Sequence, residues 1–372
     1  MLSLIEPTDL TLGQLNEILD LALDIIANRE KYSEVCRGKK LATLFYEPST
    51  RTRLSFTAAM MELGGNVLGF DDASCSSVSK GETVADTVKV ISCFADIIAL
   101  RHYEEGASLV AALNSRVPVI NAGDGSHAHP TQTLTDLLTI KRELGRLDNF
   151  TIGFCGDLRF GRTVHSLIKA LSRYKGVKVV LIAPEQLRLP GYIKREVCDG
   201  AGIPYVEVAT MEEVMPELDV LYMTRVQKER FLDEDEFDLV KDSFILTPEK
   251  IAPAKKEMRI LHPLPRVNEI TVEVDADPRA AYFRQVENGK FVRMALMLKL
   301  LEWAKCDPDK APGAGECGCP HERLIPADCL VDELKCRNRR CISNMENVPT
   351  LFRPATDKPG SFRCLYCESK PE

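Results

Sequence analysis

Hydroxyls and an arginine gather directly behind a short apolar segment of this sequence. Ser49, Thr50, Arg51 and Thr52 follow the apolar run 41–46 and precede a helical pattern. Hydroxyls, backbone N–H groups and a guanidinium at the start of a helix can cradle a phosphate. The same hydroxyls are also common helix caps, so this loop by itself fits either use equally well.

Two further loops carry donors suited to a carbonyl compound. Arg101 follows the apolar segment 97–100, and His129 and Gln132 follow the glycine-rich stretch 121–125. Donors aimed at a developing oxyanion act strongly in a dry site. A lone histidine is more often structural, so this interpretation depends on these loops converging.

Other loops add charges and carbonyl acceptors. Lys80, in the polar stretch 74–82, can act as a mobile point charge, although polar loops are ordinary surface features. Arg162 and Arg225 each follow another apolar segment and favour a small anion. In His262-Pro263-Leu264-Pro265 the prolines fix φ and remove N–H donors, so this loop offers carbonyls to an –NH2 group.

This inventory holds several cations and no obvious nucleophile or catalytic metal triad. We therefore expect catalysis by positioning and electrostatics, without a covalent intermediate or a catalytic cofactor. The expected substrates are a phosphate and a dicarboxylate. The stretch 156–162 lacks the Gly-x-Gly-x-x-Gly spacing, so a dinucleotide site is a poor match.

The elements that must position these loops alternate between strand and helix patterns. Strands are predicted at 41–46, 97–100, 117–120, 151–155, 177–182, 220–223 and 260–261. Helices are predicted at 12–25, 54–61, 129–144 and 291–304. Buried strands separated by helices indicate parallel sheets, whose ligands bind at the carboxyl ends of the strands. The expected fold is α/β, with two doubly wound parallel-sheet domains joined by helices and a small C-terminal zinc-binding β domain.

Composition bounds the function. The chain has 372 residues, 45% of them apolar, and a net charge of −7. These values exclude disorder and a coiled coil, and they disfavour a general nucleic-acid or membrane surface. The N-terminus lacks a secretory pattern and no apolar run approaches about 18 residues, so we expect a cytoplasmic protein.

Cysteines separate the end of the chain from the rest. Eight of the 13 cysteines fall within 306–372. Cys336 and Cys341, with Cys364 and Cys367, form two close pairs that fit one tetrahedral structural zinc, and disulfides are disfavoured in a reducing compartment. A second metal site is less favoured than linker thiols; its candidate ligands are Cys306, Cys317, Cys319, His321 and Cys329.

We predict the following domain boundaries. Residues 1–147, completed by a helix at about 285–305, form the first α/β domain, and residues 148–284 form the second. Residues 306–330 form a linker, and 331–372 form the zinc domain.

These motifs resemble the transcarbamoylase family, and within it the aspartate carbamoyltransferase catalytic chains. The matches run in order over about 300 residues: Ser49 to Arg53 with Ser55-Phe56, Lys80-Gly81-Glu82, His129 to Gln132, Gly161-Arg162-Thr163, Arg225-Val226-Gln227 and His262 to Arg266. The resemblance implies transfer of a carbamoyl group from carbamoyl phosphate to L-aspartate, an early step of pyrimidine synthesis. It implies that 1–147 form the carbamoyl phosphate-binding domain and that 148–284 form the aspartate-binding domain. It also implies a homotrimer whose active sites are shared between subunits.

The resemblance also implies roles for single residues. The phosphate would be held by Ser49, Thr50, Arg51 and Thr52, with Ser76 and Lys80 from a neighbouring subunit. The carbonyl would be polarised by Thr52, Arg101 and His129, and its amino group held by Gln132 and the main-chain oxygens of Leu264 and Pro265. L-aspartate would be bound by Arg162, Arg225, Gln227 and Lys80.

The segment 336–368 resembles the zinc domain of the family's regulatory chain. In the family that chain is separate and begins with a nucleotide-binding domain of about a hundred residues, for which this sequence has no room. The implied arrangement is a fusion that keeps the zinc domain, which would dock between catalytic subunits and build a higher oligomer.

Two other functions stay open. Ornithine carbamoyltransferase is the main rival, although two arginines suit two carboxylates, and that lineage typically has a cysteine where this chain has Pro263. A zinc ribbon can also bind nucleic acid. Residues 306–372 contain ten Lys/Arg and eleven Asp/Glu, so a protein interface is favoured over nucleic acid.

Overall fold

The chain folds into two compact units. A computed structural model describes residues 3–72, 80–226, 244–305 and 324–372. One unit comprises Met1–Thr131 with Gly289–Glu372, and the other comprises Gln132–Asn288. The division predicted at residue 147 stays a prediction.

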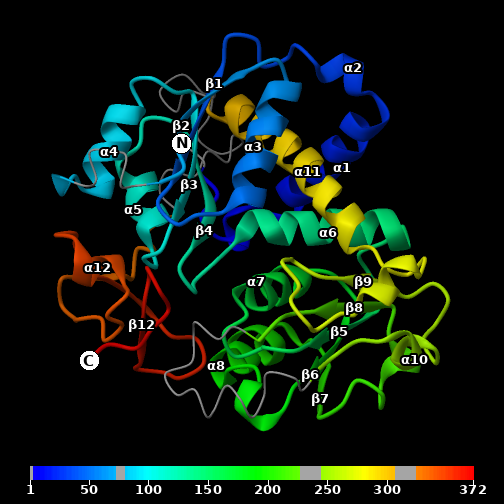
Figure 1. The fold of residues 1–372 in the computed structure, drawn as a ribbon. Helices are drawn as coiled ribbons and strands as arrows, with labels where there is room; N and C mark the ends of the chain where they lie inside the picture. Colours follow the sequence, from blue (N-terminus) through cyan, green and yellow to red (C-terminus); the bar gives the residue numbers. More distant parts are fainter. Residues whose placement is uncertain (1–2, 73–79, 227–243, 306–323) are drawn as a thin grey trace. The chain divides into compact units, whose positions relative to one another are not determined.

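The first unit is built on a parallel sheet of order β2-β1-β3-β4. Its strands are β1 (Lys40–Phe45), β2 (Asn66–Phe70), β3 (Ile97–His102) and β4 (Val119–Asp124). Every residue of β3 and β4 is buried, which requires cover on both faces. Figure 1 shows that helices supply it: α4 and α5 on one face, α1, α3 and α11 on the other.

The helices of this unit begin and end where the sequence favours it. They are α1 (Leu12–Ala27), α2 (Arg29–Tyr32), α3 (Thr50–Glu62), α4 (Val84–Ile91), α5 (Ala107–Asn114) and α11 (Tyr282–Trp303), which begins in the second unit. Thr11 starts α1 with a capping box: its hydroxyl accepts from Gln14 N at 3.2 Å, and Gln14 Oε1 accepts from Thr11 N at 2.9 Å.

The second unit contains a parallel sheet of order β7-β6-β5-β8-β9. Its strands are β5 (Thr151–Cys155), β6 (Lys178–Ile182), β7 (Tyr205–Val208), β8 (Val220–Met223) and β9 (Arg259–Leu261). Its helices include α6 (Pro130–Leu144), which begins in the first unit, α7 (Arg162–Leu171), α8 (Gly191–Ile193) and α10 (Pro248–Ile251).

Both sheets reverse their direction of growth at an internal strand. The chain leaves β1 toward β2 and returns to the other side at β3, and it leaves β5 toward β7 and returns at β8. Loops at such a switch point diverge and leave a crevice beyond the carboxyl ends of the strands. The candidate loops after β1, β3, β5 and β8 therefore stand at the ligand-binding edges of their own sheets.

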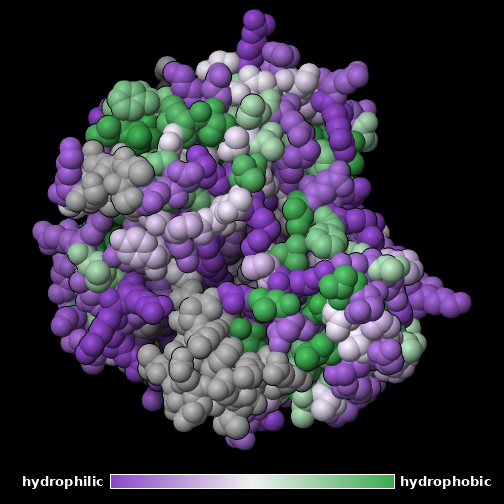
Figure 2. Space-filling view, in the orientation of Figure 1, coloured by the Kyte–Doolittle hydropathy of each residue, from purple (hydrophilic) through white to green (hydrophobic). Residues whose placement is uncertain are grey.

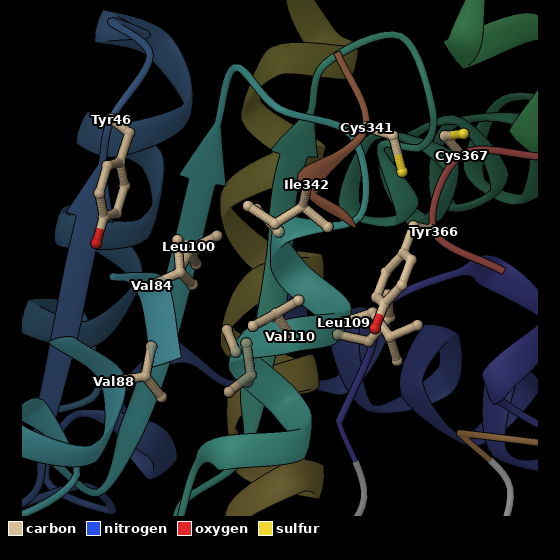
Figure 3. Close-up of a cluster of buried hydrophobic side chains, with 14 of the residues drawn as sticks. Tyr46, Val84, Val88, Leu100, Leu109, Val110, Cys341, Ile342, Tyr366 and Cys367 are labelled. Atoms are coloured by element: carbon tan, nitrogen blue, oxygen red, sulfur yellow. The ribbon is translucent and has the colours of Figure 1, made fainter. Parts of the chain in front are cut away.

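The cysteine-rich end forms a small antiparallel sheet. It comprises β10 (Leu330–Val331), β11 (Leu351–Pro354) and β12 (Phe362–Cys364), with the short helix α12 (Ile342–Met345) before β11. We call residues 330–372 the cysteine module. Its apolar residues join the core cluster of the first unit, where Figure 3 shows Ile342 and Tyr366 beside Leu109 and Val110 of α5.

The predicted fold class is confirmed, and each predicted strand is present. The sequence interpretation missed β2 and β7, which stand at the outer edge of each sheet and are only partly buried. No helix among the described ranges is long and apolar enough to span a membrane. In Figure 2 hydrophilic residues predominate over the described part of the visible face.

Candidate active site and metal centre

The loop after β1 leads directly into the first turn of α3. Ser49 stands at the N-cap, yet its side chain makes no capping hydrogen bond. Thr50, Arg51 and Thr52 form the first turn, and Arg51 is exposed. The capping use of Ser49 is therefore not realised, and this turn presents hydroxyls and a guanidinium beside the helix N-terminus, where an anion is favoured.

Arg101 is a fixed cation at the end of β3. It pairs in register with Phe45, the last residue of β1. Its Nη2 lies 2.8 Å from Glu47 Oε2, and its Nη1 donates to the Ala122 carbonyl on β4 at 3.2 Å. The side chain is only 10% exposed. Arg101 is thus held between the carboxyl ends of β1 and β4, close in the sheet to the loop that carries Arg51.

His129 precedes α6 and is buried. Its Nδ1 lies 3.4 Å from the Thr131 hydroxyl. Arg293 of α11 reaches the same place: its Nη2 donates to Thr131 Oγ1 at 3.4 Å, and its Nη1 donates to Ser55 Oγ on α3 at 3.0 Å. Arg293 therefore connects the segment that carries His129 and Thr131 with α3.

The sequence interpretation missed Arg293. A signal was present, since this cation stands within the apolar run 291–297 of the C-terminal helix and is only 5% exposed. A charge buried on such a helix needs partners elsewhere in the fold.

In the second unit, Asp136 organises a buried amide network. Asp136 Oδ1 accepts from Gln132 Nε2 at 2.7 Å and from Gln285 Nε2 at 2.6 Å, and its Oδ2 accepts from the Tyr222 hydroxyl at 2.9 Å. Gln285 Oε1 in turn accepts from His262 N at 2.9 Å. Gln132 and the His262 loop, both predicted to hold the carbamoyl amino group, are thus joined by one hydrogen-bonded chain.

The His262 side chain shapes the backbone that follows it. Its Nδ1 accepts from Leu264 N at 2.7 Å, so its Nε2 carries the hydrogen that is donated to Glu269 Oε1 at 2.7 Å. Burial opposes ionisation of Glu269, but the hydrogen bonds from His262 and from the backbone lower the pKa of that carboxyl. The hydrogen bonds of His262 with Leu264 N and with Glu269 therefore fix the backbone that leads to Leu264 and Pro265.

Arg162 and Arg225 follow neighbouring strands of the second sheet. Arg162 begins α7 after β5, and Arg225 follows β8. The two strand ends are in close contact: Thr224 N donates to Cys155 O at 2.8 Å, and a Cβ on Gly156 would stand 2.2 Å from Thr224 O. Glycine is required there, and the close approach brings the two arginine-bearing loops to the same switch point.

Lys80, predicted to contact both substrates, is exposed and lies in the segment that precedes α4. Ser76 and Gln227 lie outside the described residues.

Four cysteines of the cysteine module meet in its interior. The Sγ atoms of Cys336, Cys341, Cys364 and Cys367 all lie within 4.8 Å of one another, and all four residues are buried. The Cys336–Cys367 and Cys341–Cys364 sulfurs are 3.5 and 3.7 Å apart. A disulfide needs about 2.05 Å, whereas a tetrahedral thiolate site with metal–sulfur bonds of about 2.3 Å places its sulfurs about 3.8 Å apart.

The chemistry of this donor set also favours a metal. Hydrogen bonds among the four sulfurs raise the pKa of the Cys341 and Cys364 thiols and lower the pKa of Cys336 and Cys367. Four thiolates at this spacing would need a countercharge, which a divalent cation would supply to all of them at once. Of the predicted second metal set, only Cys329 is described; Cys306, Cys317, Cys319 and His321 lie outside the described residues.

The cysteine module is packed against the remainder of the first unit, to which it belongs. Glu105 N donates to Arg340 O and Ile342 N donates to Glu105 O, each at 3.0 Å, while Asn338 Nδ2 donates to Glu105 Oε2 at 2.6 Å. Tyr366 lies against Gly106, where a Cβ would stand 2.3 Å from the tyrosine Cβ. The described docking surface is thus intrachain, and docking between subunits stays a prediction.

Glu346 extends this contact to α4. Its Oε1 accepts from Val84 N at 2.9 Å, at the first residue of the helix that follows Lys80. Replacing Glu346 with alanine should destabilise the chain by about 1 kcal/mol, because an N-terminal donor and the helix dipole lose a carboxylate partner. Urea denaturation checks this, with the exposed Glu333→Ala as the matched control; equal midpoints for the two variants would contradict the role of Glu346.

Comparison with known proteins places these elements in one family. Residues 3–142 match the aspartate/ornithine carbamoyltransferase carbamoyl-P binding domain, and residues 148–300 match the aspartate/ornithine binding domain of the same family. Residues 328–372 match the metal binding domain of the aspartate carbamoyltransferase regulatory chain.

Similar proteins extend over most of the chain. It is 64% identical over 301 residues to the aspartate carbamoyltransferase catalytic subunit of Lachnoclostridium phytofermentans, covering 81% of this chain and 98% of the relative. It is 62% identical over 299 residues to that of Clostridium acetobutylicum, covering 80% and 97%. Since nearly all of each relative is matched, about one fifth of this chain is additional to them.

Solved structures agree with these matches. The catalytic subunit of M. jannaschii aspartate transcarbamoylase has a TM-score of 0.76 at 48% identity, covering 81% of this chain and 98% of that one. The Trypanosoma cruzi aspartate transcarbamoylase in complex with carbamoyl phosphate and aspartate has a TM-score of 0.75 at 38% identity, covering 79% and 95%. The chain belongs to the aspartate/ornithine carbamoyltransferase family, and it carries in addition a C-terminal metal binding domain of the regulatory-chain type.

Proposed function

We propose that this chain acts as an aspartate carbamoyltransferase, an enzyme that converts carbamoyl phosphate and L-aspartate into N-carbamoyl-L-aspartate and phosphate. The observation that carries the proposal is the grouping of cations at both switch points, with Arg51 and Arg101 in one unit and Arg162 and Arg225 in the other. The named catalytic subunits at 62–64% identity support it. The product is an early pyrimidine precursor, so the same proposal assigns the chain to pyrimidine biosynthesis.

Carbamoyl phosphate binding is assigned to loops of the first unit, to Gln132 of α6 and to the loop that follows β9. Ser49, Thr50, Arg51 and Thr52 hold the phosphate, with Ser76 and Lys80 supplied by a neighbouring subunit. Thr52, Arg101 and His129 donate to the carbonyl oxygen. Gln132 and the carbonyls of Leu264 and Pro265 hold the amino group. The fixed position of Arg101 between β1 and β4 supports its role, since a preorganised donor needs no rearrangement as charge develops.

The reaction follows from these placements. Arg162 and Arg225, helped by Gln227 and Lys80, bind the two carboxylates of L-aspartate and leave its unprotonated α-amine facing the carbonyl carbon. A C–N bond forms, and the carbonyl oxygen takes on negative charge that Thr52, Arg101 and His129 stabilise. The C–O bond to phosphate then breaks, phosphate leaves, and the amine proton passes to the phosphate or to solvent.

The substrate choice is tested with both amino acids in parallel. We expect carbamoyl aspartate as the product and a kcat/KM for aspartate well above that for ornithine, because two guanidinium groups attract two carboxylates and repel an extra amine. A colorimetric ureido assay on the purified chain measures both reactions. Higher turnover with ornithine would overturn the choice of aspartate.

The metal and the assembly belong to the same proposal. Zinc is assigned to the four-cysteine cluster because four thiolates in tetrahedral spacing suit it. Its role is structural and it takes no part in the reaction. The proposed location is cytoplasmic, a reducing compartment in which the four thiols stay available to a metal. The proposed assembly is a homotrimer, because Ser76 and Lys80 are assigned to the active site of a neighbouring subunit. A higher oligomer is proposed separately, formed by docking of the cysteine module between subunits.

A further inference from the structure

His129 follows a short turn between β4 and α6 whose internal hydrogen bonds involve Asp124. Asp124 ends β4 and α6 begins at Pro130. Within the turn, Ala128 N donates to Asp124 Oδ1 at 3.1 Å, His127 N donates to Asp124 O at 3.0 Å, and Asp124 N donates to Ala128 O at 3.3 Å. The position of His129 therefore depends on how firmly Asp124 and its neighbours are held.

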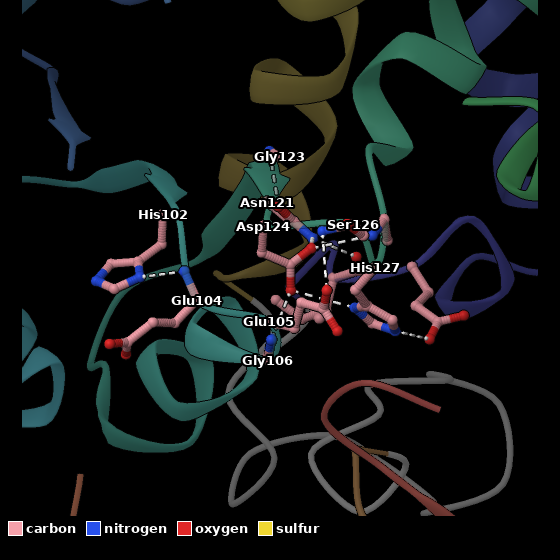
Figure 4. Close-up of polar contacts among 12 residues, drawn as sticks. His102, Glu104, Glu105, Gly106, Asn121, Gly123, Asp124, Ser126 and His127 are labelled. Atoms are coloured by element: carbon pink, nitrogen blue, oxygen red, sulfur yellow. Dashed lines mark hydrogen bonds and ion pairs between the residues drawn. The ribbon is translucent and has the colours of Figure 1, made fainter. Parts of the chain in front are cut away.

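The His127 ring lies between two carboxylates, as Figure 4 shows. Its Nδ1 is 3.2 Å from Asp124 Oδ2, and its Nε2 is 2.9 Å from Glu6 Oε1. The His127 side chain is 4% exposed and that of Asp124 is fully buried. A neutral imidazole has one N–H and would direct a lone pair at one of these oxygens, whereas an imidazolium donates to both.

The charges around His127 favour the protonated ring. Burial opposes protonation, but Asp124 and Glu6 together raise the pKa of His127 well above its ordinary value. Two further carboxyls face it: Asp9, in the 3-10 helix Pro7–Asp9, and Glu105, in the loop before α5. Burial raises the pKa of Asp9 to about 7. Asp9 and Glu105 interact with His127 only through their charge, whereas Asp124 and Glu6 contact the ring directly.

The Asp124 carboxylate also accepts hydrogen bonds from β4 and from the loop before α5. Its Oδ1 accepts from Asn121 Nδ2 at 2.9 Å, and its Oδ2 accepts from Gly106 N at 3.0 Å. A fully buried carboxylate with these partners still needs a countercharge, since removing one partner of a buried pair leaves an uncompensated charge. His127 supplies that charge within the turn itself.

Glu6 ties the turn to the N-terminal segment. Leu4 bridges to Ile120 on β4, and Asn121 Nδ2 donates to Ile5 O at 3.0 Å. The segment that carries Glu6 is therefore anchored along β4, independently of His127. Glu6 thus gives the imidazolium a second, separately anchored partner.

We propose that His127 is a positioning residue, whose imidazolium, clamped between Asp124 and Glu6, fixes the turn that presents His129 to the carbamoyl carbonyl. This inference rests on the proposed carbamoyltransferase function. His127 itself touches no reacting atom. Its loss leaves Asp124 uncompensated and loosens the approach of His129, which affects the chemical step rather than the binding of aspartate.

The test compares His127→Gln with wild type and with Lys39→Gln. Lys39 forms an ion pair of 2.7 Å with Asp96 at the amino-terminal end of the same sheet, away from the turn. At pH 7 we expect His127→Gln to lower kcat about tenfold, because small displacements of a catalytic group are costly. The KM for aspartate should stay nearly unchanged, and Lys39→Gln should resemble wild type.

The pH profile separates positioning from a merely structural role. The folded-state pKa of His127 is raised, so the advantage of wild type is complete at low pH and is lost as the pH rises through that value. The ratio of wild-type kcat to His127→Gln kcat should fall from about ten at pH 7 toward one at alkaline pH. Hydrogen exchange of residues 121–131 should be faster in the variant at pH 7.

The outcomes are distinguishable. If wild type forms no carbamoyl aspartate, the proposed function fails. If wild type is active and His127→Gln matches Lys39→Gln in kcat, or the kcat ratio does not change with pH, the inference alone fails. If His127→Gln does not fold, Glu6→Gln replaces it; this variant keeps the Asp124–His127 pair and should lower kcat about threefold, and an unchanged kcat would overturn the inference.

Discussion

Replacement of Arg51 by alanine should lower kcat/KM for carbamoyl phosphate by about 10²–10³-fold, which corresponds to about 3–4 kcal/mol of transition-state stabilisation. Arg51 lies in the first turn of α3 with its side chain exposed. Its removal therefore opens no cavity in the core. We expect the loss to fall on the binding of the phosphate, because the guanidinium and the helix N-terminus together favour its negative charge. Steady-state kinetics with varied carbamoyl phosphate measures it.

Arg53 provides the matched control for this experiment. It is an arginine of the same helical turn, but its Nη1 lies 2.6 Å from Asp71 Oδ2, which is 68% exposed. Exposed ion pairs contribute little, about 0–1 kcal/mol. Arg53→Ala should therefore retain kcat/KM within about threefold, since 1.4 kcal/mol is needed for a tenfold change. A comparable loss in both variants would mean that the cationic turn acts through folding, and the phosphate assignment of Arg51 would fail.

Removal of the metal should unfold the cysteine module while the parallel sheets persist. The module has three short strands and a four-residue helix around the four sulfurs. Metal binding to comparable small sites provides on the order of 10 kcal/mol of folding free energy. We expect a chelator, or Cys364→Ser, to make the module the first site of tryptic cleavage. Native mass spectrometry should show one zinc ion lost per chain.

Docking makes this effect larger than the module alone implies. Ile342 and Tyr366 leave the cluster they share with Leu109 and Val110, and α4 loses the Glu346 carboxylate at its first turn. Increased binding of a hydrophobic dye should report the uncovered face. Cys93→Ser is the matched control, because Cys93 is an exposed cysteine of the same unit outside the metal cluster. Metal release without any change in proteolysis would contradict a structural role for the metal.

Local patterns predicted the parts of this fold that depend on neighbouring residues. Strand, turn and helix follow one another within a few tens of residues, so the placement of Arg51 after β1 and of Arg162 after β5 could be predicted from apolar runs and helical spacing. The two cysteine pairs, Cys336 with Cys341 and Cys364 with Cys367, could be predicted in the same way, because the two ligands of each pair lie within a few residues of each other in the sequence.

The sequence patterns did not predict the edge strands or the buried polar networks. β2 and β7 are partly exposed and lack the continuous apolar run that marks a central strand. Asp136 and Gln285 are polar residues on two different helices, and the residues near them in the sequence do not predict the hydrogen bond between them. A buried polar group requires a partner, yet this requirement does not say which partner it finds.

The sequence by itself therefore determined the alternating α/β architecture, the residue types in each candidate loop and the two cysteine pairs. Only the tertiary structure decided that Arg293 joins α3 to Thr131, that His127 lies between Asp124 and Glu6, and that the cysteine module rests on α4 and α5. The physical reason is that these contacts link residues far apart along the chain. Their partners are selected by how the elements pack, which no local spacing of residues encodes.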